Sequence, residues 1–228
     1  HCPGFGPVGV TFAVYQQLKK ALYLQRYFGA AWLTYRLHYF LRLRAGALKR
    51  RLPVRHWGEI PFEALTKKAG LADADSLFHH RKDMGRLFFF DPDERDNYTT
   101  HFSRWDGDRS ATLATADAVQ RGVFLYFGRH EQHMGLPPEW HLDPFTNSRA
   151  PGHKHWSQIP DFGSGDIKCI WELNRFGFAY DLVRAYCRTG NEAYPACFWS
   201  LVESWQEQNP PQQGPNWKCG QEIAFRVM

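Results

Sequence analysis

Cysteines are few in the 228-residue sequence, and none is arranged as a C-x-x-C pair. The five thiols, Cys2, Cys169, Cys187, Cys197 and Cys219, lack the paired spacing of a structural zinc site or a redox motif. We therefore expect reduced cysteines that are mostly buried. A disulfide such as Cys187–Cys197 would require export, and the segment that starts at His1 does not have the pattern of a signal peptide.

Long apolar runs and internal repeats are also missing. A membrane-spanning helix needs about 20 apolar residues, and the best candidate is interrupted by Lys19, Lys20, Gln25 and Arg26. We therefore expect a soluble or peripheral protein without an integral membrane segment. No segment recurs at a fixed period, so the sequence does not predict a repeat solenoid.

Aromatic residues and positive charge are plentiful instead. Aromatic side chains make up 16% of the chain, and the net charge is +5 with a pI of about 9.0. Much of the positive charge falls within residues 36–55. A basic balance favours polyanionic partners, which include nucleic acid, anionic membrane surfaces and acidic polysaccharides. Aromatic platforms suit both sugar rings and nucleobases, so composition alone leaves these partners open.

The N-terminal part of the chain has helical periodicity over residues 8–51, with an expected break at Gly29. One face is basic and aromatic. It indicates either an amphipathic helix with a solvated charged face, which is the commoner case, or a helix that binds an interface or a polyanion. Ser110 to Val119 also has helical character, and the segment "GVFLYFG" at 122–128 is either a short strand or a buried turn of helix.

An irregular stretch over residues 129–166 is rich in His, Pro and Trp. Its "RHEQH" motif places His130 and His133 around Glu131, but the second histidine comes one residue too early for the H-E-x-x-H zinc motif. Adding His153 and His155 does not produce the spacing of a known metal site. We expect no metal and no cofactor.

The last third of the sequence predicts an antiparallel helical hairpin followed by a further helix. The first helix is expected to start after Asp166 as its N-cap and to end at Gly190. The second is capped by Asn191 and stops at Asn209 before Pro210. A third helix is expected to begin after Asn216.

Several short motifs follow one another in this region. They are "WHLDP" at 140–144, "WELNRF" at 171–176, "TGNEAY" at 189–194, "W…NP" at 205–210 and "GPNW…E…R" at 214–226. Together they resemble the N-terminal α/α toroid domain of the heparinase II/III-like polysaccharide lyases. The resemblance covers about residues 124–228 and is weak before them.

This resemblance implies an all-α fold with an incomplete α/α toroid built from antiparallel helical hairpins. Residues 1–121 would form a helical, loop-rich extension, and residues 122–228 would begin the toroid domain. The implied activity of the parent protein is cleavage of uronate-containing acidic polysaccharides, such as heparin, heparan sulfate or alginate, by β-elimination. The resemblance leaves the location open between the periplasm and the cytoplasm of a bacterium, and it leaves the oligomeric state open.

The chemistry of β-elimination requires a donor that neutralises the uronate carboxylate, a general base and a general acid. In the family these groups are Asn or His and a Tyr that follow the "NW…E…R" helix. This sequence has no Asn-Asn-His motif and no matching Tyr, so we expect the catalytic residues beyond Met228 and no lyase activity from this chain alone.

The chain itself is expected to supply part of the substrate cleft, because the matching motifs carry side chains that suit anionic sugars. The candidate substrate-binding residues are Asn174, Arg175, Asn216, Trp217, Glu222 and Arg226. Structural roles compete with this assignment. Arg175 lies three residues after Glu172 and can pair with it, Trp171 and Trp205 suit a core, and Asn216 can cap a helix.

A second class of function is a non-catalytic helical-repeat scaffold that binds protein or polyanionic partners. The missing repeat period disfavours the scaffold. No motif of a nucleic-acid-binding fold is present, so we expect no nucleic-acid partner.

Overall fold

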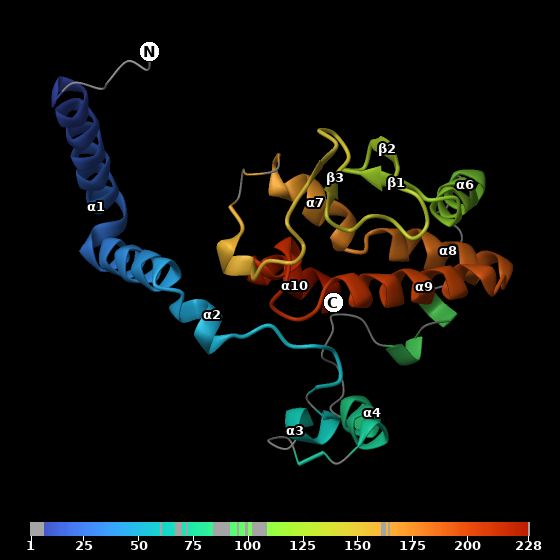
Figure 1. The fold of residues 1–228 in the computed structure, drawn as a ribbon. Coiled ribbons are helices and arrows are strands. Elements are labelled where there is room, and N and C mark those ends of the chain that lie inside the picture. The colour runs from blue at the N-terminus through green and yellow to red at the C-terminus, as the bar shows by residue number, and fades with distance from the viewer. Residues whose placement is uncertain are drawn as a thin grey trace. The chain divides into compact units, whose positions relative to one another are not determined.

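The computed structural model describes residues 7–59, 61–66, 70–71, 73–83, 92–94, 96–98, 100–101, 109–160, 163 and 165–227. Its contacts divide the chain into two compact units, His1–Pro53 and Val54–Met228. The protein is mostly helical, and it also contains two small two-stranded sheets (Figure 1). The expected all-α class is thus confirmed only as a mostly helical fold, because it left out these sheets.

The first unit is built from the helices α1 (Pro7–Arg44) and α2 (Ala47–Arg51). Gly29 kinks α1 as predicted, with φ 80° and ψ 165°. Residues other than glycine rarely adopt this backbone conformation. The change of direction is visible in the dark blue ribbon of Figure 1. Within the described residues, none of the helices combines the length and the apolar character needed to cross a membrane.

The second unit mixes helices, short 3₁₀ turns and two hairpins. Its elements are α3 (Phe62–Thr66), α4 (Ala74–Asp83), η2 (Pro92–Glu94), α6 (Arg109–Gln120), β1 (Val123–Tyr126), β2 (His130–His133), β3 (Leu142–Asp143), β4 (Ser148–Arg149), η3 (Trp156–Gln158), α7 (Ile167–Asn174), α8 (Phe178–Thr189), α9 (Ala193–Gln208), η4 (Pro215–Trp217) and α10 (Gly220–Val227). The antiparallel strands β1 and β2 pair Val123 with His133, and β3 and β4 pair Leu142 with Arg149. The segment at 122–128 therefore contains a strand.

The long helix expected between Asp166 and Gly190 is two helices, α7 and α8. Both predicted ends are confirmed: the Asp166 carboxylate accepts the amide of Lys168 at 3.0 Å, and Gly190 has φ 65°. The helix breaks at residues 175–177, where Phe176 has φ 59°. The break turns the Phe176 ring against Trp140, Phe178 and Trp205, so packing of an aromatic ring overrides the continuous helical periodicity.

The core of the second unit lies between α6, β1, α8 and α9. Buried aromatic residues dominate it, and the ring of Phe178 contacts those of Phe124 and Trp140. The buried aromatic residues are Phe124, Tyr126, Trp140, Phe178, Tyr194 and Trp205. The Tyr194 hydroxyl donates to the Asp117 carboxylate of α6 at 2.8 Å. The helix α6 is part of this core, and the expected domain division after residue 121 stays a prediction.

The described cysteines, Cys169, Cys187, Cys197 and Cys219, are free thiols, and Cys2 lies outside the described residues. The expectation that they are mostly buried is wrong, because Cys187 is exposed and the other three are only partly buried. Burial raises the pKa of Cys169 and of Cys197, which disfavours the reactive thiolate.

Gly122, between α6 and β1, is the glycine whose replacement should cost most. It has φ 77°, its carbonyl accepts the amide of Met134, and an added Cβ would lie 2.6 Å from the carbonyl carbon of Gly135. Gly128 also has a positive φ but has open space around it. We expect Gly128→Ala to cost about 1 kcal/mol in unfolding free energy and Gly122→Ala about 3 kcal/mol or more. Urea denaturation measures both, and equal costs would contradict the close approach.

Candidate functional site

The six candidate residues come from three segments and meet in one region of the second unit. Asn174 ends α7 and Arg175 follows it, Asn216 and Trp217 lie in η4, and Glu222 and Arg226 lie in α10. Contacts join α7 to η4 and to α10. The structure therefore brings all six together, although their contact with a substrate stays a prediction.

Asn174 is the centre of a buried hydrogen-bond network. Its Nδ2 donates to the carbonyl oxygens of Ile170 (2.7 Å) and Trp140 (2.9 Å). Its Oδ1 accepts from the indole nitrogen of Trp205 (2.7 Å) and from Nδ2 of Asn216 (2.8 Å). The amide thus makes all four hydrogen bonds that it can make, which offsets the cost of burying it.

Asn209 and Asn216 extend this network. Asn216 Nδ2 also donates to Asn209 Oδ1 at 2.8 Å, and Asn209 Nδ2 donates to the carbonyl of Trp205 at 2.9 Å. The exposed fractions of Asn174, Asn209 and Asn216 are 1%, 0% and 0%. Their side chains are therefore directed into the protein, and Asn216 links two asparagines instead of capping a helix.

His141 closes the other end of the network. Its Nε2 lies 3.0 Å from Asn209 Oδ1, and this nitrogen carries the proton because Asn209 Oδ1 can only accept. An added Cβ on Gly152 would lie 2.3 Å from the imidazole, so the loop packs tightly on the ring. Burial lowers the pKa of His141, since the charged imidazolium would lose its hydration.

Sequence reasoning did not identify Asn209 or His141 as members of the site. The sequence indicates only a helix stop at Asn209 before Pro210, and Asn209 does follow the last residue of α9. His141 lies within "WHLDP", which carried the family resemblance without pointing to this residue. A buried polar side chain leaves no local signal in a sequence, because its partners come from distant segments.

Arg175 is held by two carboxylates. It makes two parallel bonds to Glu222, from Nε and Nη2, each 2.7 Å long, and its Nη1 donates to Glu172 at 2.6 Å. The predicted pair with Glu172 is therefore present, and the buried Glu222 is a second partner. Hydrogen bonding to Glu222 raises the pKa of Arg175. With its charge compensated on two sides, this guanidinium is poorly available to an incoming anion.

Arg226 is a cation of a different kind. Its Nη1 donates to the carbonyl of Asn174 at 3.4 Å and its Nη2 donates to the carbonyl of Asn216. Its guanidinium lies 5.0 Å from the ring centre of Trp205. Burial lowers the pKa of Arg226 to about 10. No described residue forms an ion pair with it, so it is a partly buried cation that is charged at neutral pH.

Trp217 packs inside the unit. Its ring centre lies 5.8 Å from that of Trp57 and 6.1 Å from that of Trp205, and its indole nitrogen donates to the carbonyl of Asn209 at 3.3 Å. Trp205 itself is buried, as the competing structural interpretation predicts, whereas Trp171 is only half-buried and donates to the carbonyl of Pro215.

A pocket of about 480 Å³ lies beside Arg175 and Arg226. Phe176, in the break between α7 and α8, and side chains from α8, α9 and α10 form the rest of its lining. The side chains from these helices include Tyr180, Val183, Tyr186, Phe198 and Phe225. Tyr180 is 71% exposed. The pocket thus combines aromatic surfaces with the guanidinium of Arg226 at one side, which makes no direct ion pair with a described residue. Such a combination can hold an anionic ring.

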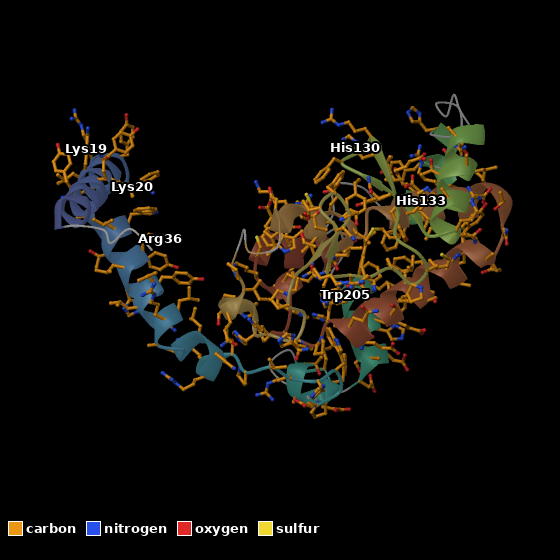
Figure 2. All side chains as sticks on the ribbon, turned by 45° about the horizontal axis from the view of Figure 1, so that its top comes forward. Lys19, Lys20, Arg36, His130, His133 and Trp205 are labelled. Atoms are coloured by element: carbon orange, nitrogen blue, oxygen red, sulfur yellow. The ribbon has the colours of Figure 1, made fainter. Side chains whose placement is uncertain are left out.

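The histidines of the "RHEQH" motif lie elsewhere. His130 and His133 are exposed on strand β2, whereas Trp205 lies within the unit (Figure 2). Among the described residues, no group of three or more His, Cys, Asp or Glu side chains is placed to hold a metal ion.

Comparison of the chain with protein-family models, with curated proteins and with solved structures gives no match. The resemblance to heparinase II/III-like lyases therefore remains a prediction.

Replacing Asn174 tests the buried network. We expect Asn174→Ala to lower the unfolding free energy by about 3–5 kcal/mol, because it leaves Trp205, Asn216 and a buried carbonyl without their partner. Asn191→Ala is the control, since this exposed amide only accepts from Ala193 at the start of α9 and should cost about 1 kcal/mol. Urea denaturation compares them, and equal losses would contradict the central place of Asn174.

The pH dependence of stability tests the burial of His141. Because burial lowers its pKa, the unfolded state binds more protons than the folded state below about pH 6.5. The contribution of His141 is therefore a loss of stability as the pH falls from 7 to 5, with a slope of at most about 1.4 kcal/mol per pH unit. We expect His141→Gln to reduce this slope in urea titrations. His153→Gln, at an exposed position, should leave the slope unchanged, and an unchanged slope in His141→Gln would contradict the assignment.

Proposed function

We propose that this chain forms part of the substrate cleft of a polysaccharide lyase that cleaves uronate-containing acidic polysaccharides by β-elimination. In this proposal the chain belongs to an α/α toroid of the heparinase II/III-like kind. The lyase chemistry and the toroid rest on the motif resemblance. The observation that supports substrate binding is the pocket between α8, α9 and α10, with Arg226 at its side.

The physical argument concerns the charge of Arg226. A uronate carries one carboxylate per ring, and a partly buried guanidinium that has no direct ion pair binds such a group more strongly than a solvated one. Arg226 makes no ion pair with a described residue, and the charge of Glu222 one turn away compensates it only in part. Arg175 lines the same pocket, but its guanidinium is already paired with the carboxylates of Glu172 and Glu222. We therefore assign carboxylate binding to Arg226 and a supporting role to Arg175.

The aromatic side chains supply the second part of the binding surface. Tyr180 and Phe225 are both well exposed beside the pocket, and flat rings of this kind stack on the apolar faces of sugars. The buried asparagines act indirectly, through Arg226. Asn174 and Asn216 present the backbone carbonyls that hold the guanidinium of Arg226, so they position this side chain.

A protein-binding scaffold is the second candidate function, and one observation favours it. Tyr180, Val183 and Trp199 are exposed on α8 and α9, and exposed apolar residues on neighbouring helices also suit a partner helix. The two functions differ in their dependence on charge, because docking of an apolar helix does not require the guanidinium of Arg226.

Replacing Arg226 tests the proposed function. We expect Arg226→Gln to weaken the binding of a heparin-derived or alginate-derived oligosaccharide about tenfold, equivalent to about 1.4 kcal/mol, because the carboxylate loses its charged partner. Arg226→Lys keeps the charge and should retain most of the affinity. The matched control is Arg184→Gln, since Arg184 is exposed on α8 and does not line the pocket. Fluorescence anisotropy measures the affinities, and thermal unfolding checks that each variant is folded.

Equal affinities of Arg226→Gln and the unmutated protein would contradict the proposal and favour the scaffold. The same samples can be followed by the ultraviolet absorbance of unsaturated uronate products. We expect binding without turnover from this chain, and clear turnover would show that the division between cleft wall and catalytic groups is wrong.

A further inference from the structure

The first unit has an extreme charge composition. Residues 1–53 contain lysine or arginine at positions 19, 20, 26, 36, 42, 44, 49, 50 and 51, and they contain no aspartate or glutamate. The first acidic residue of the chain is Glu59. The positive charge of these residues exceeds the net charge of the whole chain, which is +5. The rest of the chain therefore has a negative net charge, and the positive field of the protein originates in the first unit.

Cations and tyrosines share one face of α1 before the kink at Gly29. Tyr15, Lys19, Tyr23 and Tyr27 recur every four residues, and Arg26 follows Tyr23 by three, so that the side chains lie on the same side of the helix. We call Tyr15, Lys19, Lys20, Tyr23, Arg26 and Tyr27 the tyrosine–lysine face. The three tyrosines are 60%, 58% and 67% exposed, and the three cations are exposed as well.

The tyrosine–lysine face is long, and its aromatic rings lie between its cations. At 1.5 Å per residue, the helix between Tyr15 and Tyr27 extends about 18 Å, which suits an extended polymer better than a small ion. The rings of Tyr23 and Tyr27 lie 4.5 Å apart, so they form a continuous aromatic surface between the cations. Figure 2 places Lys19 and Lys20 on this part of α1 and Arg36 beyond the kink.

Two of the cations beyond the kink, Arg36 and Arg44, have aromatic partners. The Arg36 guanidinium lies 5.8 Å from the ring centres of both Trp32 and Tyr39, and that of Arg44 lies 4.7 Å from the ring centre of Phe40. These contacts restrain the two guanidinium groups. The cations of the tyrosine–lysine face make no such contact among the described residues, so their charge and the neighbouring tyrosine rings are both open to a ligand.

We propose that the tyrosine–lysine face of α1 is a second binding site for acidic polysaccharide, separate from the pocket of the second unit. The identity of the polyanion rests on the proposed function. Charge complementarity supplies the attraction to carboxylate or sulfate groups, and the tyrosine rings supply stacking surfaces for the sugars. Because both sites belong to one chain, a polymer bound to the face has a raised effective concentration for the pocket.

An anionic membrane surface fits the same face less well. A helix that lies in a membrane interface has its charges on one side and its apolar residues on the other. On this helix Leu24 and Phe28 do lie on the side opposite the cations. Leu22, however, borders the cationic side, and the three exposed tyrosines share the face of the cations, where sugar rings can stack on them. The arrangement of the side chains thus favours a soluble polymer as the ligand.

The test is a charge-neutralising variant, Lys19→Gln/Lys20→Gln/Arg26→Gln, measured in the full chain. We expect its affinity for a long heparin chain to fall at least tenfold. The slope of log affinity against log salt should become shallower by about two to three, by analogy with counterion release from nucleic acids. The matched control is Arg121→Gln/Lys154→Gln/Lys168→Gln, which removes the same charge from exposed positions of the second unit and should change the affinity less than twofold.

A second variant separates polysaccharide from membrane binding. Tyr23→Leu/Tyr27→Leu removes the stacking surfaces and keeps apolar bulk, so it should weaken heparin binding severalfold and leave the salt dependence unchanged. Binding to duplex DNA and to vesicles that contain anionic lipid is measured at the same salt. The proposal is overturned if the triple variant binds heparin like its control, or if its loss is larger for DNA or vesicles than for heparin.

These results are distinguishable from failure of the proposed function. Loss of binding in Arg226→Gln with normal binding in the α1 variants would support the pocket and overturn this second site. The converse would support the second site and contradict the role of the pocket.

Discussion

The four hydrogen bonds of the buried Asn174 amide connect α7, the Trp140 loop, α9 and η4. Each of these segments would otherwise place a polar group in the interior without a partner, at a cost of about 1–3 kcal/mol per group. The same bonds fix where the backbone carbonyls of Asn174 and Asn216 lie, and both carbonyls accept from Arg226. The position of Arg226 beside the pocket therefore depends on an amide that is itself inaccessible to ligands.

The two arginines beside the pocket differ because of their neighbours. Arg175 is bound by Glu222 and Glu172, so its charge serves to tie α10 to the turn after α7. Arg226 rests on carbonyl oxygens and on the face of Trp205, and burial lowers its pKa while leaving it charged at neutral pH. A cation in this setting interacts strongly with an added anion, since little solvent screens it. This difference in electrostatic environment assigns anion binding to Arg226.

Local sequence signals predicted the ends of helices well, because caps act over a few residues. Asp166 and Gly190 cap their helices as their residue types predict. Gly29 kinks its helix because its backbone can adopt a positive φ. The break at Phe176 could not be predicted, since it depends on aromatic rings from distant segments. Likewise, the motifs identified Arg175 and Glu222 as candidates, but their mutual ion pair spans 47 positions of sequence. No local pattern indicates such a pair, nor the places of Asn209 and His141.

The most direct measurement of the central claim is a nuclear magnetic resonance titration of the isotope-labelled protein with a short uronate-containing oligosaccharide. The account predicts that the largest shifts in the second unit occur at the Arg226 side chain and at Tyr180 and Phe225 of the pocket. The buried amide of Asn174 should follow with smaller shifts, because it contacts the ligand only through Arg226. Saturation of the protein without any change at Arg226 and Tyr180 would contradict the account.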